Sequence, residues 1–128
     1  MAEPSVVHEQ ERDEERWPGD EVGGSWKTLI SAGRTPSESL TLGVARLGQG
    51  EVLQTHRHAQ PEVYLVLAGT GRVTIAGEAS AVRAGTAVFI PGNALHSLEA
   101  TGDELRLAYA FAADSMDDVE YHFPASGD

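Results

Sequence analysis

Three histidines and one glutamate fall at spacings that suit a single metal site. One residue separates His56 from His58, three residues separate His58 from Glu62, and His96 lies further along the chain. In an extended strand, residues two apart project from the same face, so His56 and His58 can present two imidazoles about 7 Å apart. Imidazole suits iron, nickel, copper or zinc, and an added carboxylate keeps manganese in range. The spacing therefore predicts one divalent transition metal ion, either iron, manganese, nickel or zinc, with His56, His58, Glu62 and His96 as its ligands.

The ligand types favour a metal site with open positions. Structural zinc sites are usually closed tetrahedra built with thiolates, and this chain contains no cysteine. Four nitrogen and oxygen ligands leave two positions free on an octahedral ion. We therefore expect a substrate or a water molecule to reach the metal.

The residues around these ligands have the pattern of β-strands. Residues 40–45 and 62–67 alternate between two faces with a period of two, and strand-like runs also cover residues 72–76, 86–90 and 104–111. Turn signals rich in glycine, proline, asparagine or aspartate separate the runs at intervals of about ten residues. This spacing predicts an all-β sandwich or barrel, and no long helical period competes with it.

Glycines and ligands together form two segments with fixed spacing. The first runs from Gly50 to Gly69 in the order Gly-x5-His-x-His-x3-Glu-x6-Gly, and it resembles the first signature segment of the cupin superfamily at every fixed position. The second segment, which contains His96, departs from the pattern of many cupins because Asn93 and Ala100 replace a glycine and an asparagine. The resemblance implies a single cupin barrel, which is a double-stranded β-helix of jelly-roll type.

We expect the chain to have three parts: an acidic N-terminal segment over residues 1–24, the cupin barrel over residues 25–113, and a C-terminal segment over residues 114–128. A chain of 128 residues can bury about two thirds of its unfolded surface and is too short for two ordinary domains. The first part shows no strand alternation. It is flexible or partly helical, with two or three helical turns between Val6 and Arg16, although an isolated helix of that length is marginal in water.

The charge of the chain argues against two classes of partner. The formal net charge is −11, and eight of the twenty acidic residues lie in residues 1–24. Nucleic acids and anionic membrane surfaces require basic patches, which the scattered arginines do not form. The sequence also lacks an apolar run of about 18 residues and has no basic start followed by an apolar stretch. We therefore expect a cytoplasmic protein that acts on a small molecule.

Strand parity places a phenol beside the predicted metal. If Glu62 points towards the ion, Tyr64 points to the same interior face one strand repeat away. A tyrosine with a pKa near 10 is a poor base, but a nearby divalent cation stabilises the phenolate and lowers that pKa. Tyr64 is therefore the predicted catalytic base.

Four short segments give a narrower resemblance. Trp26 to Ile30, Glu62 to Tyr64, Gly92 to His96 and Val119 to Tyr121 resemble segments of small single-domain cupins that act as dimethylsulfoniopropionate lyases. In that family three histidines and a glutamate hold a divalent transition metal, which binds the carboxylate of the substrate. The resemblance implies that Tyr64 takes the proton next to this carboxylate and that Tyr121 lines the pocket.

These observations predict a metal-dependent lyase that acts on a small carboxylate by proton abstraction and β-elimination. Loss of the proton with expulsion of a neutral sulfide needs no redox cofactor. A cationic sulfonium group needs aromatic faces. The candidates for this substrate pocket are Trp26, Tyr109, Phe111 and Tyr121.

Three alternatives remain open from the sequence: a metal-dependent oxygenase, an isomerase or epimerase of a small hydroxylated substrate, and a module that binds a small ligand without catalysis. By analogy with other cupins, which bury strand edges and an apolar sheet face, we also expect a homodimer.

Overall fold

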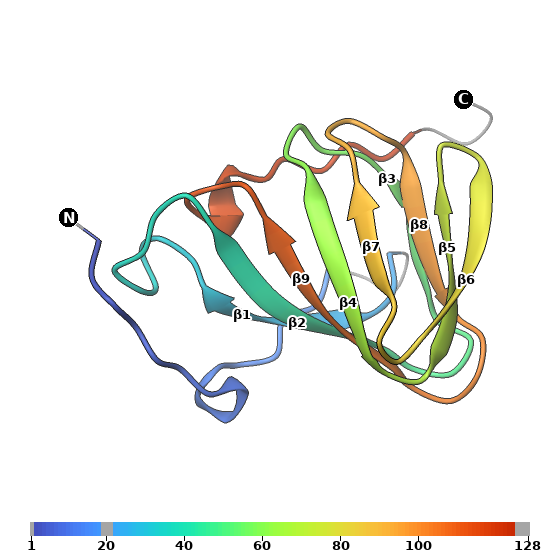
Figure 1. Cartoon of the computed structure of the whole chain (residues 1–128), viewed down its shortest axis with the longest axis horizontal. Helices are drawn as coiled ribbons and strands as arrows, with labels where there is room; N and C mark the ends of the chain where they lie inside the picture. Colours follow the sequence, from blue (N-terminus) through green and yellow to red (C-terminus); the bar gives the residue numbers. More distant parts are fainter. Residues whose placement is uncertain (1, 19–21, 125–128) are drawn as a thin grey trace.

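The chain folds into two antiparallel β-sheets that face each other (Figure 1). The computed structural model describes residues 2–18 and 22–124. One sheet has the strand order β1-β2-β9-β4-β7 and the other has the order β3-β8-β5-β6. The strands are β1 (Ser25–Ile30), β2 (Thr41–Leu47), β3 (Val52–His56), β4 (Glu62–Ala68), β5 (Thr70–Ile75), β6 (Glu78–Arg83), β7 (Ala87–Ile90), β8 (His96–Ala100) and β9 (Leu105–Phe111). This arrangement confirms the predicted all-β jelly-roll barrel.

The helical content of the described residues is small. It consists of two 3-10 turns, η1 (Glu9–Glu11) and η2 (Met116–Asp118). Within the same residues, neither turn is long or apolar enough to cross a membrane.

A period of two along the strands separates an inner face from an outer face. On β4, Glu62, Tyr64 and Val66 are buried, whereas the residues between them are largely exposed. All four odd-numbered residues of β9, from Leu105 to Phe111, are buried as well. Because β4 and β9 pair directly, their inward side chains form one continuous surface between the sheets. The core of the barrel lies on this surface.

Two rows of inward residues cross the five-stranded sheet and position the site. Glu62 pairs with Phe111 on β9 and with Ile90 on β7. One repeat further along the strand, Tyr64 pairs with Tyr109 on β9. Glu62 and Tyr64 therefore share one face, as strand parity predicts.

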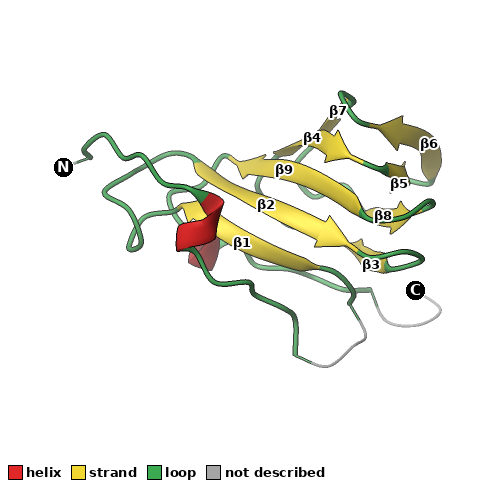
Figure 2. Ribbon diagram, turned by 90° about the horizontal axis from the view of Figure 1, so that it is seen from below, coloured by secondary structure: helices red, strands yellow, loops and turns green. Residues whose placement is uncertain are grey.

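The N-terminal segment packs along the sheet, with little helix. We refer to residues 2–18 as the N-terminal strap. The predicted helical turns between Val6 and Arg16 reduce to the three residues of η1, since so short a helix is marginal in water, and acidic side chains of the strap pair with arginines outside it. Glu15 forms an isolated antiparallel bridge with Trp26 of β1, and Figure 2 shows the strap running beside that strand.

Candidate metal centre and cavity

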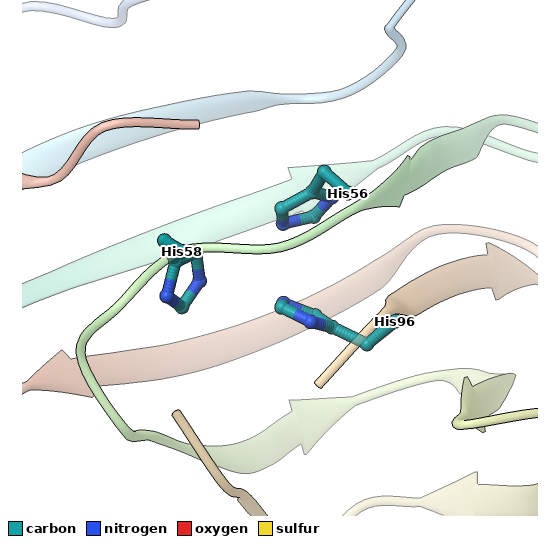
Figure 3. Close-up of side chains that lie close together, drawn as sticks. All are labelled: His56, His58 and His96. Atoms are coloured by element: carbon teal, nitrogen blue, oxygen red, sulfur yellow. The ribbon is translucent and has the colours of Figure 1, made fainter. Parts of the chain in front are cut away.

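Three buried imidazoles converge at one end of the barrel (Figure 3). His56 ends β3, His58 follows it in the loop to β4, and His96 begins β8. The register of β3 and β8 pairs His56 directly with His96. Each of the three residues is only 1 % exposed, and one ring nitrogen from each lies within 4.8 Å of the others. The fold therefore brings together the three predicted histidine ligands.

Backbone carbonyl groups fix the protonation of the three rings. The Nδ1 atoms of His56, His58 and His96 lie 2.7, 2.9 and 2.8 Å from the carbonyl oxygens of Gln54, Gln60 and Ala94, respectively. A carbonyl oxygen only accepts hydrogen bonds, so each Nδ1 must carry the proton. In a neutral ring, Nε2 then presents a lone pair. This is the tautomer in which a histidine binds a metal through Nε2.

Glu62 approaches two of the three histidines from the opposite sheet. Its Oε1 atom lies 3.2 Å from Nε2 of His58 and 3.4 Å from Nε2 of His96. Two ligands held about 2.1 Å from one ion stand about 3.0 to 3.4 Å apart in octahedral or tetrahedral geometry. The separations around Glu62 match this range.

One polar atom at the centre, Nε2 of His96, lacks a partner among the described residues. A carboxylate oxygen cannot donate a hydrogen bond to an Nε2 lone pair. Within residues 2–18 and 22–124, Nε2 of His96 is buried and has no hydrogen-bond partner. A buried polar atom left in this way costs about 1 to 3 kcal/mol. One divalent ion would satisfy the three lone pairs together, so the three histidines fit a metal ion, and the carboxylate of Glu62 lies beside two of them.

Burial also keeps His56 in its metal-binding form. Desolvation, followed by the neighbouring His96, lowers the pKa of His56 to about 4. His56 is therefore neutral at pH 7. A neutral imidazole is the form that binds a metal.

A small cavity of about 50 Å³ lies against two of the four candidate ligands. His56, Glu62 and Tyr64 line it together. Burial, followed by the negative charge of Glu62, raises the pKa of Tyr64 well above its ordinary value. In the chain by itself, Tyr64 is therefore a neutral phenol.

Three of the four predicted pocket aromatics line the same cavity, namely Trp26, Tyr109 and Tyr121. Phe111 takes a different place: it is 1 % exposed, and its ring packs edge to face on His58 with centroids 5.0 Å apart. Phe111 thus packs against His58 and does not line the cavity.

Two residues that line the cavity each carry a polar side-chain atom that has no hydrogen-bond partner within the described part of the chain. These atoms are the hydroxyl of Tyr109 and Nε1 of Trp26, both buried. Gly43 makes room for Tyr109, because a Cβ atom at this position would collide with the phenol oxygen. The hydroxyl of Tyr109 therefore packs closely against the backbone of β2 at Gly43.

Comparison with known proteins identifies the family of this barrel. Residues 43–112, more than half of the chain, match the cupin domain family. The chain is a cupin. Among solved structures, it superposes on Rru_A2000 from Rhodospirillum rubrum, a cupin-2 domain, with a TM-score of 0.78 and 20% identity, covering 100% of this chain and 85% of the other. A chain from the DMSP lyase structures of RdDddP and RnDddQII gives a TM-score of 0.75 at 16% identity, covering 88% of this chain and 62% of the other. At these identities, the structures share the fold.

One curated relative is much more similar in sequence. Dimethylsulfoniopropionate lyase DddW of Ruegeria pomeroyi is 46% identical over 101 residues, which cover 79% of this cupin. The matched region spans 66% of the length of that relative, just under two thirds.

The altered second cupin segment keeps the backbone geometry that a glycine would supply. Asn93, at the position of the missing glycine, has a φ angle of 65°. Asparagine is among the non-glycine residues that adopt this left-handed conformation most readily. The backbone N–H of Asn93 donates to the carbonyl oxygen of His58 at 2.7 Å. The substitution thus keeps the loop of His96 bonded to the loop of His58.

Sequence reasoning missed two aromatic residues beside the site. Trp17, from the N-terminal strap, lines the cavity and contacts Tyr121 edge to face with ring centroids 4.8 Å apart. Phe123 lies 5.7 Å from both Trp17 and His56, measured between ring centroids. Both residues lie outside the strands, where no sequence period predicts their position. Only their aromatic character in two polar terminal segments could have singled them out.

Proposed function

We propose that this cupin is a metal-dependent lyase that acts on a small carboxylate with a sulfonium group at its β-carbon, as in dimethylsulfoniopropionate. The observation that carries the proposal is the 46% identity to a dimethylsulfoniopropionate lyase. The joint presence of Tyr64, Glu62 and His56 in one cavity wall supports it further.

In the proposed reaction, the phenolate of Tyr64 accepts the proton from the carbon next to the carboxylate. That C–H bond breaks, a C=C bond forms, and the C–S bond breaks with its electron pair leaving on sulfur. The products are an unsaturated carboxylate, a neutral sulfide and the proton now held by Tyr64. Atoms and electrons balance without an oxidant or a reductant.

A bound divalent ion would provide the positive charge that a phenolate of Tyr64 needs nearby. A divalent ion held by the three histidines and Glu62 would withdraw charge from the carboxylate and stabilise a nearby phenolate. Without it, burial and Glu62 keep the pKa of Tyr64 well above its ordinary value. Proton acceptance by Tyr64 would therefore depend on a metal ion held by the three histidines and Glu62.

Aromatic faces supply the binding site for the cationic end of the substrate. Trp26, Tyr109 and Tyr121 line the cavity with Tyr64. A cation over an aromatic face gains about 0.5 to 2 kcal/mol, and most where water is excluded. The carboxylate end and the sulfonium end of the substrate would thus meet different parts of one small cavity.

We also propose that two copies of the chain associate through the outer face of the five-stranded sheet. Four large apolar side chains of β4 and β7 lie exposed on it, Val63 (46 %), Leu65 (47 %), Leu67 (42 %) and Phe89 (64 %). Val63 and Phe89 pair directly across these strands, so the patch is continuous. Exposed apolar patches of this kind mark interaction surfaces, and a face that pairs with itself gives a two-fold dimer.

The lyase activity is tested by incubating metal-loaded protein with dimethylsulfoniopropionate and measuring sulfide in the headspace. Tyr64→Phe should reduce kcat by a factor of about 10² to 10⁴, because it removes the proton acceptor. Tyr109→Phe, which removes a hydroxyl from the same row of the sheet, is the matched control and should reduce kcat by less than about tenfold. Sulfide release no greater than that of the metal-free protein would contradict the proposal.

A further inference from the structure

One wall of the cavity comes from outside the barrel. Trp17 belongs to the N-terminal strap, yet it lines the same cavity as His56 and Glu62. Its ring centroid lies 5.1 Å from that of Trp26 and 4.8 Å from that of Tyr121. Trp17 thus stands between an aromatic residue of β1 and one of the C-terminal segment.

Several contacts hold the strap where Trp17 reaches the cavity. Two residues before Trp17, Glu15 exchanges backbone hydrogen bonds of 2.7 and 2.9 Å with Trp26. The carboxylate of Glu15 accepts hydrogen bonds of 2.9 and 3.2 Å from Arg34 and one of 2.9 Å from the hydroxyl of Thr28. Further along the strap, Glu9 pairs with Arg106 at 2.8 Å. The indole therefore has a defined position.

We propose that Trp17 is a specificity-determining residue that limits the size of the groups carried by the cationic end of the substrate. The inference rests on the proposed function, because it takes this cavity as the substrate site. The free space is only about 50 Å³, so an indole in the wall decides whether a larger alkyl group fits. In an apolar pocket, one methylene group changes discrimination by about 10- to 200-fold.

The test measures binding, so that it does not depend on turnover. The probes are 3-(trimethylammonio)propanoate and 3-(tripropylammonio)propanoate, nitrogen analogues of the proposed substrate whose amine is a poorer leaving group than a sulfide. Isothermal titration calorimetry on the metal-loaded protein gives the ratio of the two Kd values. The native protein should bind the trimethyl analogue at least about tenfold more tightly.

Removing the indole should reduce the preference for the trimethyl analogue over the tripropyl analogue. The tripropyl analogue should bind Trp17→Ala more tightly than it binds the native protein, by a factor of about ten or more, because the indole no longer limits the space. Trp17→Leu keeps part of the wall and should give an intermediate ratio. Val6→Ala is the matched control in the same strap, since Val6 is fully exposed, and it should leave the ratio unchanged.

Each outcome decides the proposal. An unchanged ratio in Trp17→Ala and Trp17→Leu overturns it, as does a native protein that binds neither analogue. Circular dichroism checks the fold of the variants, and Trp17→Leu decides if Trp17→Ala does not fold. A changed ratio in a protein that releases no sulfide supports the role of Trp17 and refutes only the lyase activity. Sulfide release with an unchanged ratio refutes only the role of Trp17.

Discussion

Arg57 and His122 exchange two backbone hydrogen bonds, of 3.0 and 2.9 Å, between the segment of His56 and His58 and the C-terminal segment. Arg57 lies between His56 and His58, so this bridge fixes the C-terminal segment directly beside the candidate metal centre. The neighbouring Tyr121 consequently has its ring centroid 5.0 Å from that of His56 and 5.3 Å from that of His58.

We predict that His122→Pro moves Tyr121 and lowers activity. Proline removes the N–H that donates to Arg57, a bond worth about 0.5 to 1.5 kcal/mol. Sulfide release should fall by up to about tenfold, while bound metal, measured by elemental analysis, stays unchanged. His122→Ala keeps both backbone bonds and should behave like the native protein. Equal losses in the two variants would show that the imidazole, rather than the bridge, matters.

The carboxylate of Glu62 gives a separate prediction on metal binding. Glu62→Gln keeps the size of the side chain but removes the negative charge beside the imidazoles of His58 and His96. Changes in the partners of metal ligands already weaken binding by about 10- to 100-fold, so loss of a ligand charge should weaken it by at least that much. Elemental analysis after dialysis against a weak chelator measures the retained ion. Glu78→Gln makes the same change at an exposed position of β6, and full loss of metal there, or none in Glu62→Gln, would contradict the assignment.

Parts of this molecule that depend on neighbouring residues in the sequence can be predicted, whereas parts that depend on contacts between distant residues cannot. Strand parity alone places Tyr64 on the face of Glu62, because side chains alternate with a period of two. The sequence did not predict strand β6. Its side chains are mostly exposed and only Val82 is buried, so the segment lacks the alternation of apolar and polar residues that indicates a strand. The position of Trp17 depends on the contacts of Glu15 with Arg34 and Trp26, which are distant in sequence. No local pattern encodes such contacts.

The apolar outer face predicts the effect of a single charge on oligomeric state. Leu65 lies in the middle of the exposed row of β4 and is 47 % exposed. Leu65→Arg would bury a guanidinium without a partner in the proposed dimer interface. Light scattering after size exclusion should give twice the chain mass of 13.6 kDa for the native protein and the single chain mass for the variant.

Leu40 supplies the matched control for this substitution. It is 63 % exposed and precedes β2, away from the patch of β4 and β7. Leu40→Arg should therefore leave the dimer intact. A native protein of single chain mass would contradict the dimer, and a dimeric Leu65→Arg would place the interface elsewhere.

The ion pair of Glu15 predicts how acid releases the N-terminal strap. Hydrogen bonding from Arg34, the largest cause, lowers the pKa of Glu15 below its ordinary value of 4.5. The folded state therefore binds this proton less readily than the unfolded state does. The contribution of Glu15 to stability is complete above about pH 4.5 and is lost as the pH falls through the lowered pKa.

Tryptophan emission can follow this release, because Trp17 lies two residues from Glu15. Between pH 7 and pH 3, the emission of the native protein should shift to longer wavelength as the indole becomes exposed to water. In Glu15→Gln, part of the shift should already be present at pH 7 and the acid step should be smaller, since the pair contributes at most about 1 kcal/mol at this partly exposed position. Glu3→Gln, at an exposed position of the same strap, should titrate like the native protein. An acid step of equal size in Glu15→Gln would show that other carboxylates hold the strap.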